Sequence, residues 1–173
     1  MDLDEFLLFI PLLIYGIALT ELLGQWKRLF DIENWYAPYI ITVIAFTETS
    51  IWNIYNFFEL FTQRESNSYP DYLLALAGPL LLLLAVNGLI KDDNDNDIVD
   101  RDEFMRRIRR TYLLMGCFVV LHLLPGFQYD GSIPLRVAGA IALFATAIFR
   151  KDWLVYFVGF VWVVGLVQRI AAG

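Results

Sequence analysis

Apolar residues gather in six long runs along the chain, separated by short polar segments. The runs cover about residues 5–24, 35–61, 72–90, 104–124, 134–149 and 153–170. Most of them are close to the roughly 20 residues with which a helix crosses the hydrocarbon core of a bilayer. The pattern predicts an all-α fold, a polytopic transmembrane helical bundle of about six spans that forms a single domain over residues 1–173.

Basic residues give this bundle an orientation. If the N-terminus lies outside, ten of the thirteen Lys and Arg residues fall on the inner side. These ten are Lys27, Arg28, Lys91, Arg101, Arg106, Arg107, Arg109, Arg110, Arg150 and Lys151. Only Arg64, Arg136 and Arg169 fall on the outer side. Because cationic loops stay in the cytoplasm, we predict an N-out/C-out, multi-pass protein, placed in a bacterial inner membrane.

The composition is typical of a membrane protein and argues against one class of partner, nucleic acid. The chain is 58% hydrophobic, more than a soluble domain of its size, and 16% aromatic. Six spans take about 120 residues, which leaves no room for a large soluble domain. The net charge of −6 argues against nucleic acid as a partner. Cys117 is the sole cysteine, so an intramolecular disulfide cannot form.

Polar residues form a stripe along the second apolar run. Its members are Glu48, Thr49, Asn53, Asn56 and Glu59. An ionised carboxylate in hydrocarbon is costly, so Glu48 should be protonated, paired or in contact with water. No Lys or Arg lies at mid-depth in any span, so we expect no salt bridge to Glu48 within one chain unless Arg136 reaches inward. The stripe is either a proton or cation pathway or, as we favour, a set of hydrogen bonds that joins helices or subunits.

The acidic loop at residues 91–103 resembles the calcium-binding loop of the EF-hand family. Side-chain oxygens stand at the spacing of that family's ligands, in Asp92, Asn94, Asn96, Asp100 and Glu103. Asp97 stands where the family has a glycine, and Asp adopts the required left-handed backbone less readily. The resemblance implies a calcium site, the one cofactor that any motif suggests. The alternative, which we favour, is a solvated acidic turn.

Four arginines follow this loop within five residues. Arg106, Arg107, Arg109 and Arg110 lie at the entrance of the fourth span, on its cytoplasmic side. A basic cluster in this position is typical of an anchor to anionic lipid headgroups. The alternative is a docking surface for a cytoplasmic protein. We favour the lipid contact.

The chain resembles a family of small, uncharacterised multi-span membrane proteins common in bacteria. The features that carry the resemblance are the first span's end at residues 16–23 (GIALTELL), the central Pro79 of the third span and the arginine-rich entrance of the fourth. It implies no particular activity. His122 is the only histidine, and we find no phosphate-binding loop or nucleophile motif, so we expect no catalytic residues and no enzyme. We expect a non-catalytic membrane subunit, sensor or anchor, homo-oligomeric and in contact with lipid; the alternative is an ion- or proton-conducting bundle.

Overall fold

The computed structural model describes residues 3–30, 36–62, 69–90, 101–124 and 133–172. These residues form six α-helices and one short 3₁₀-helix, with no strand among them. In chain order they are α1 (Leu3–Gln25), η1 (Trp26–Leu29), α2 (Ala37–Thr62), α3 (Tyr69–Leu89), α4 (Arg101–Leu121), α5 (Ile133–Phe149) and α6 (Asp152–Ala172). The all-α class is therefore confirmed, and each helix overlaps the apolar run from which it was predicted.

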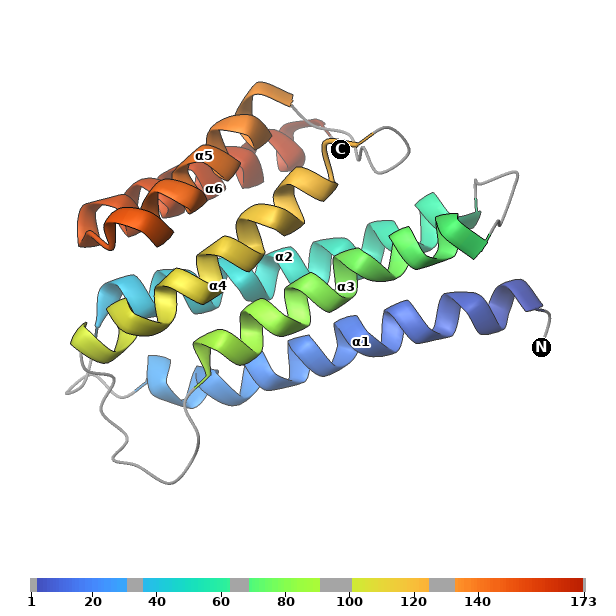
Figure 1. Ribbon diagram of the computed structural model, residues 1–173, viewed down its shortest axis with the longest axis horizontal. Helices are drawn as coiled ribbons and strands as arrows, with labels where there is room; N and C mark the ends of the chain where they lie inside the picture. Colours follow the sequence, from blue (N-terminus) through green and yellow to red (C-terminus); the bar gives the residue numbers. More distant parts are fainter. Residues whose placement is uncertain (1–2, 31–35, 63–68, 91–100, 125–132, 173) are drawn as a thin grey trace.

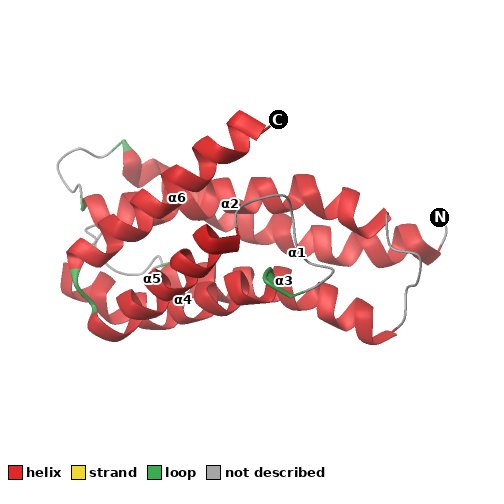
Figure 2. Cartoon of the chain, turned by 90° about the horizontal axis from the view of Figure 1, so that it is seen from above, coloured by secondary structure: helices red, strands yellow, loops and turns green. Residues whose placement is uncertain are grey.

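The six helices lie in two layers of three. One layer contains α6, α2 and α1, and the other contains α5, α4 and α3 (Figures 1 and 2). At the edges of the bundle α1 packs on α3, and α5 packs on α6. The middle helices α2 and α4 face each other, so they divide the interior into two compartments. The first lies among α1, α2, α3 and α4, and the second among α2, α4, α5 and α6.

Successive helices run in opposite directions, so α2, α4 and α6 begin at the same end of the bundle (Figure 1). We call this the basic end, because the exposed cations Lys27, Arg101, Arg150 and Lys151 lie there. The other end, where α1 begins and α6 finishes, is the opposite end. Because the helices alternate in direction, these four cations lie at one end of the bundle. The topology predicted from the sequence places all four on the inner side of the membrane.

One carboxylate joins three helices at the basic end. Asp152, the first residue of α6, accepts a hydrogen bond from the Tyr36 hydroxyl, which precedes α2, at 2.9 Å. Its second oxygen accepts a bond from Arg101 Nε, at the start of α4, also at 2.9 Å. This hydrogen bond and the charge of Asp152 raise the pKa of Arg101 above its ordinary value. The starts of α2, α4 and α6 are thereby held in register, and an acidic first residue also suits the positive end of the α6 dipole.

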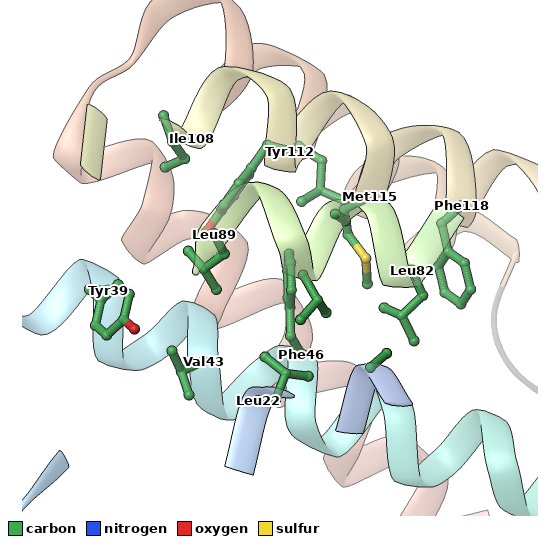
Figure 3. Packing of buried hydrophobic residues seen from close by; sticks show 14 of the residues in the cluster. Leu22, Tyr39, Val43, Phe46, Leu82, Leu89, Ile108, Tyr112, Met115 and Phe118 are labelled. Carbon is green, nitrogen blue, oxygen red and sulfur yellow. The ribbon is translucent and has the colours of Figure 1, made fainter. Parts of the chain in front are cut away.

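The first compartment contains most of the hydrophobic core. All but three of the clustered buried residues come from α1 to α4; the exceptions are Leu143, Ala147 and Val155. Figure 3 shows Leu82, Phe46 and Met115, from three different helices, converging between the layers. A buried hydrogen bond joins the two layers within this core, between the hydroxyls of Thr42 in α2 and Tyr112 in α4, which are 2.8 Å apart. It fixes α2 against α4 in the middle of the bundle.

Two of the described helices are long and apolar enough to cross a membrane by length and composition. They contain the stretches Tyr72–Leu89 of α3 and Asp152–Ala171 of α6. Phe9–Gln25 of α1 and Ile133–Phe149 of α5 are apolar but shorter. The amphipathic α4 carries its arginines in the first turns, and α2 carries the polar stripe. The structure therefore establishes a helical bundle in which two described helices are long and apolar enough to cross a membrane.

Candidate functional site

A carboxylate and a guanidinium meet inside the second compartment. Arg169 of α6 donates from one terminal nitrogen to Glu48 Oε2 of α2, and the two atoms are 2.9 Å apart. The side chains keep only 18% and 22% of their surface exposed, respectively. The expectation that no cation within the chain reaches Glu48, except through Arg136, is therefore wrong.

Helix geometry explains how a residue near the end of α6 reaches the middle of α2. Asp152 and Tyr36 are bonded at the basic end, and from there Arg169 is about 25 Å along α6 while Glu48 is about 18 Å along α2, at 1.5 Å per residue. Side chains on a helix point back towards its N-terminus. The long Arg169 side chain covers the difference in the same way as an arginine that snorkels, but here it extends into the bundle.

Two tryptophans complete this ion pair. Trp162 of α6 donates from its indole nitrogen to the same oxygen, Glu48 Oε2, at 2.8 Å. Trp52, one turn after Glu48, lies under the guanidinium of Arg169, with 4.8 Å between its ring centroid and Cζ. A cation–π contact of this kind contributes about 0.5–2 kcal/mol, depending on how far it is desolvated. The pair is thus oriented from both helices, and three contacts join α2 to α6.

A cavity of about 200 Å³ lies beside the pair. Its walls come from α2, α4, α5 and α6, so it occupies the second compartment. The lining residues are Ala45, Phe46, Thr49, Met115, Val119, Leu135, Arg136, Gly139, Leu143, Val158, Val161, Trp162, Gly165 and Arg169. Apart from the two arginines and Thr49, the wall is built from apolar and aromatic side chains and glycines.

The cavity extends through the middle of the bundle and towards the opposite end. On α6 its lining runs from Val158 to Arg169, about 16 Å of helix. Val158 and Leu143 line the part nearer the basic end, since each is six residues, about 9 Å, from the end of its helix there. Arg136, near the start of α5, and Arg169, near the finish of α6, lie towards the opposite end. Both arginines of the lining therefore lie towards the opposite end, whereas the lining nearer the basic end is apolar.

Arg169 keeps one donor without a hydrogen bond in the described part of the chain. Its Nε atom is buried and finds no hydrogen-bond partner among the residues that the structure describes. Arg136, by contrast, donates to the backbone carbonyl of His122, where α4 finishes, at 3.2 Å. A buried donor without a partner costs about 1–3 kcal/mol, and the contacts of Arg169 with Glu48 and Trp52 offset this cost.

The polar residues of the α2 stripe do not form one continuous network. Glu48 forms the ion pair, and Thr49 lines the cavity. Asn53 and Asn56 donate instead to the carbonyls of Thr49 and Trp52, one turn earlier in the same helix, both at 2.7 Å. Asn53 Oδ1 is buried and has no partner in the described part of the chain. The side chain of Glu59 lies outside the described residues.

Most of the predicted calcium ligands also lie outside the described residues. These are Asp92, Asn94, Asn96 and Asp100. Glu103 is described, and its carboxylate pairs with Arg107, one turn later in α4, at 2.8 Å. In the described ranges no group of three or more His, Cys, Asp or Glu residues is placed to hold a metal ion.

The four arginines of α4 are not equivalent. Arg107 is half-buried and donates to the carbonyl of Ile90, just after α3, where a helix leaves acceptors without intrahelical partners. Arg106, Arg109 and Arg110 are exposed. Arg107 therefore joins α4 to the end of α3. Of the four arginines, the other three form an exposed basic surface.

Sequence reasoning missed Arg169 and Trp162 as partners of Glu48, and Trp52 as a partner of Arg169. One signal was available in the sequence: Trp162, Gly165 and Arg169 recur at helical spacing, so they share one face of an otherwise apolar helix. A cation on such a face needs an acid on a neighbouring helix. Which acid it meets depends on the packing of α6 against α2, which no local pattern determines.

Comparison of the chain with protein-family models, with curated proteins and with solved structures finds no match in any of the three.

Proposed function

We propose that this protein is a six-span integral membrane protein with a non-catalytic role, as a subunit, sensor or anchor of a larger assembly. The observation that carries the proposal is an exposed apolar surface on every helix. Exposed large apolar side chains, one taken from each helix, are Ile17, Ile51, Leu84, Val120, Ile141 and Phe160. Such a surface on all sides suits lipid or another subunit and not water. The cations of the basic end support a cytoplasmic position for that end.

Two kinds of contact follow from this placement. The apolar flanks are available to acyl chains and to further copies of the chain, so we propose a homo-oligomer within the bilayer of a bacterial inner membrane. The exposed Arg106, Arg109 and Arg110 of α4 suit anionic lipid headgroups, at about 1 kcal/mol for each basic residue near the surface. A cytoplasmic protein that docks on these arginines is the alternative contact.

Cysteine labelling in intact cells tests the membrane placement. The exposed Cys117 is first replaced by serine, and a single cysteine is then introduced at Lys27 or at Tyr69, both exposed and at different ends. We expect a membrane-impermeant maleimide to label Tyr69→Cys in intact cells and Lys27→Cys only after permeabilisation. Labelling of both variants in intact cells, or the reverse pattern, would contradict the proposed orientation.

Conduction of protons or cations is the second candidate, favoured by one observation. The cavity brings Thr49, Trp162 and the Glu48–Arg169 pair together within the bundle, beside a helix whose Asn53 keeps a buried acceptor without a partner in the described structure. If the cavity is part of a pathway, purified protein in lipid vesicles should produce a flux that Glu48→Gln changes by a large factor. The absence of flux from both forms would exclude this candidate.

A further inference from the structure

We infer that the cavity among α2, α4, α5 and α6 binds a small, uncharged, apolar molecule, of about the size of a benzene ring with a short alkyl group. The inference goes beyond the proposed function and does not depend on it, because it assigns a ligand to the interior of the bundle. It rests on three features of the cavity: the chemistry of its wall, the bonding of the two arginines in that wall, and the volume.

The wall of the cavity presents an almost wholly apolar surface. Aliphatic side chains line it from all four helices, and include Ala45 of α2, Val119 of α4, Leu143 of α5 and Val158 of α6. A charged or strongly polar molecule would lose its hydration in such a cavity without gaining hydrogen bonds in return. The wall therefore disfavours ions of either sign and favours an uncharged, apolar ligand.

The charged groups of the two arginines in the wall are held by other residues. The guanidinium of Arg169 is bonded to Glu48 and lies over the ring of Trp52, and its Nε atom is buried. Arg136 donates to the backbone carbonyl of His122. Long basic side chains commonly cover apolar surface with their methylene groups while the charged head bonds elsewhere. Both arginines therefore line the cavity mainly with their aliphatic stems, in agreement with the apolar surface of the wall.

The volume of the cavity sets the size of the ligand. A volume of about 200 Å³ suits a molecule of about eight non-hydrogen atoms, since apolar cavities of about 150 Å³ bind benzene or xenon. A molecule that fills such a space gains dispersion contacts with the surrounding side chains. The wall also contains the aromatic rings of Phe46 and Trp162 and the thioether of Met115, which make favourable contacts with an aromatic ring. Ethylbenzene therefore represents the class of ligand that we expect.

The methionine methyl resonances of the purified protein in phosphatidylcholine nanodiscs test this assignment. Met115 lies in the wall, whereas Met105, about 15 Å earlier in α4, is not part of the lining and serves as the internal control. We expect ethylbenzene to shift the Met115 signal in a saturable way, through the ring current of the bound ring, and to leave Met105 unchanged. An unshifted Met115 signal would mean that the cavity is closed to such molecules or is filled by a lipid acyl chain, and either outcome would overturn the inference.

Two charged molecules of similar size test the selectivity of the cavity. Benzylammonium and benzoate carry the same ring with a cationic and an anionic group. We expect each ion to bind at least about tenfold more weakly than ethylbenzene, because the wall offers no group that replaces the lost hydration. Equal affinity for either ion would overturn the inference. The cysteine-labelling result for the membrane placement would stand unchanged, because it depends on residues outside the cavity.

Variants with larger side chains in the wall locate the site. Val158→Phe on α6 and Ala45→Leu on α2 each reduce the space in the cavity. We expect each to weaken ethylbenzene binding by about tenfold or more, while the melting temperature stays close to that of the wild type, since the added atoms occupy the cavity. The matched control Val163→Phe, exposed on α6 and outside the lining, should leave the affinity unchanged. Unchanged affinity in both wall variants, or an equal loss in the control, would place the ligand elsewhere and overturn the inference.

Discussion

Replacing Glu48 by Gln is expected to lower the free energy of unfolding by about 2–3 kcal/mol, somewhat less than the roughly 3–5 kcal/mol lost when one partner of a fully buried ion pair is removed. The physical reason is that the guanidinium of Arg169 stays in the second compartment with its charge uncompensated. The expected loss is smaller than for a fully buried pair because about a fifth of each side chain remains exposed to solvent, which screens the charge. Thermal unfolding followed by circular dichroism in detergent measures the loss.

A double-mutant cycle measures the interaction free energy between Glu48 and Arg169. Arg169→Met alone should also be destabilising, because among the described residues Glu48 is then bonded to Trp162 alone. The double variant Glu48→Gln, Arg169→Met should be less destabilised than the sum of the single ones, since neither charge is then left unpaired. The matched control is Glu21→Gln, an exposed carboxylate of α1, which should change stability by less than about 0.5 kcal/mol. Strict additivity in the cycle would refute the interaction.

Replacing Gly159 or Gly116 by alanine is expected to destabilise the bundle by about 1–3 kcal/mol each, the usual cost of extra volume in a packed interior. A Cβ at Gly159 of α6 would lie 2.6 Å from Cγ2 of Ile41 in α2. A Cβ at Gly116 of α4 would lie 2.8 Å from two ring carbons of Phe144 in α5. Neither neighbour is the flexible end of a long side chain, so the helices themselves must move apart.

Gly16 supplies the matched control for these two glycines. It is also within a helix, α1, but a Cβ there would have no neighbour within 4 Å. Gly16→Ala should therefore raise stability by up to about 1 kcal/mol, the gain in helix propensity when glycine becomes alanine. Melting temperatures of the three variants, measured side by side, check the prediction. If Gly16→Ala is as destabilising as Gly159→Ala, the close contact between α6 and α2 is not the cause.

The helices were predictable because their signals are local. The apolar runs predicted the bounds of α3 and α6 to within three residues, although Pro79 lies in the middle of α3. Charged and proline-containing segments between the runs marked where helices begin and end, as Asp152 does at α6. Short connections also favour helices that alternate in direction, and this alternation places the starts of α2, α4 and α6 at one end.

The candidate site was only half predictable. Glu48 stood out because a carboxylate in the middle of an apolar helix is costly and therefore needs a partner. Arg169 did not, because its backbone lies far from mid-depth and the predicted topology placed it on the outer side. Asn53 and Asn56 illustrate the converse: their spacing suggested a continuous network with Glu48, but their amides bond to carbonyls of their own helix.

The sequence by itself determined the all-α class, the places where helices begin and end, and the gathering of cations at one end, because each depends on residues close together in the chain. Only the tertiary structure decided that α6 packs on α2, that Glu48 meets Arg169 and Trp162, and that a cavity remains beside them. Those features arise from the fit of side chains on different helices, where contacts such as Gly159 on Ile41 set the separation to a fraction of an ångström. Periodicity specifies which face of a helix is buried but not which neighbour covers it.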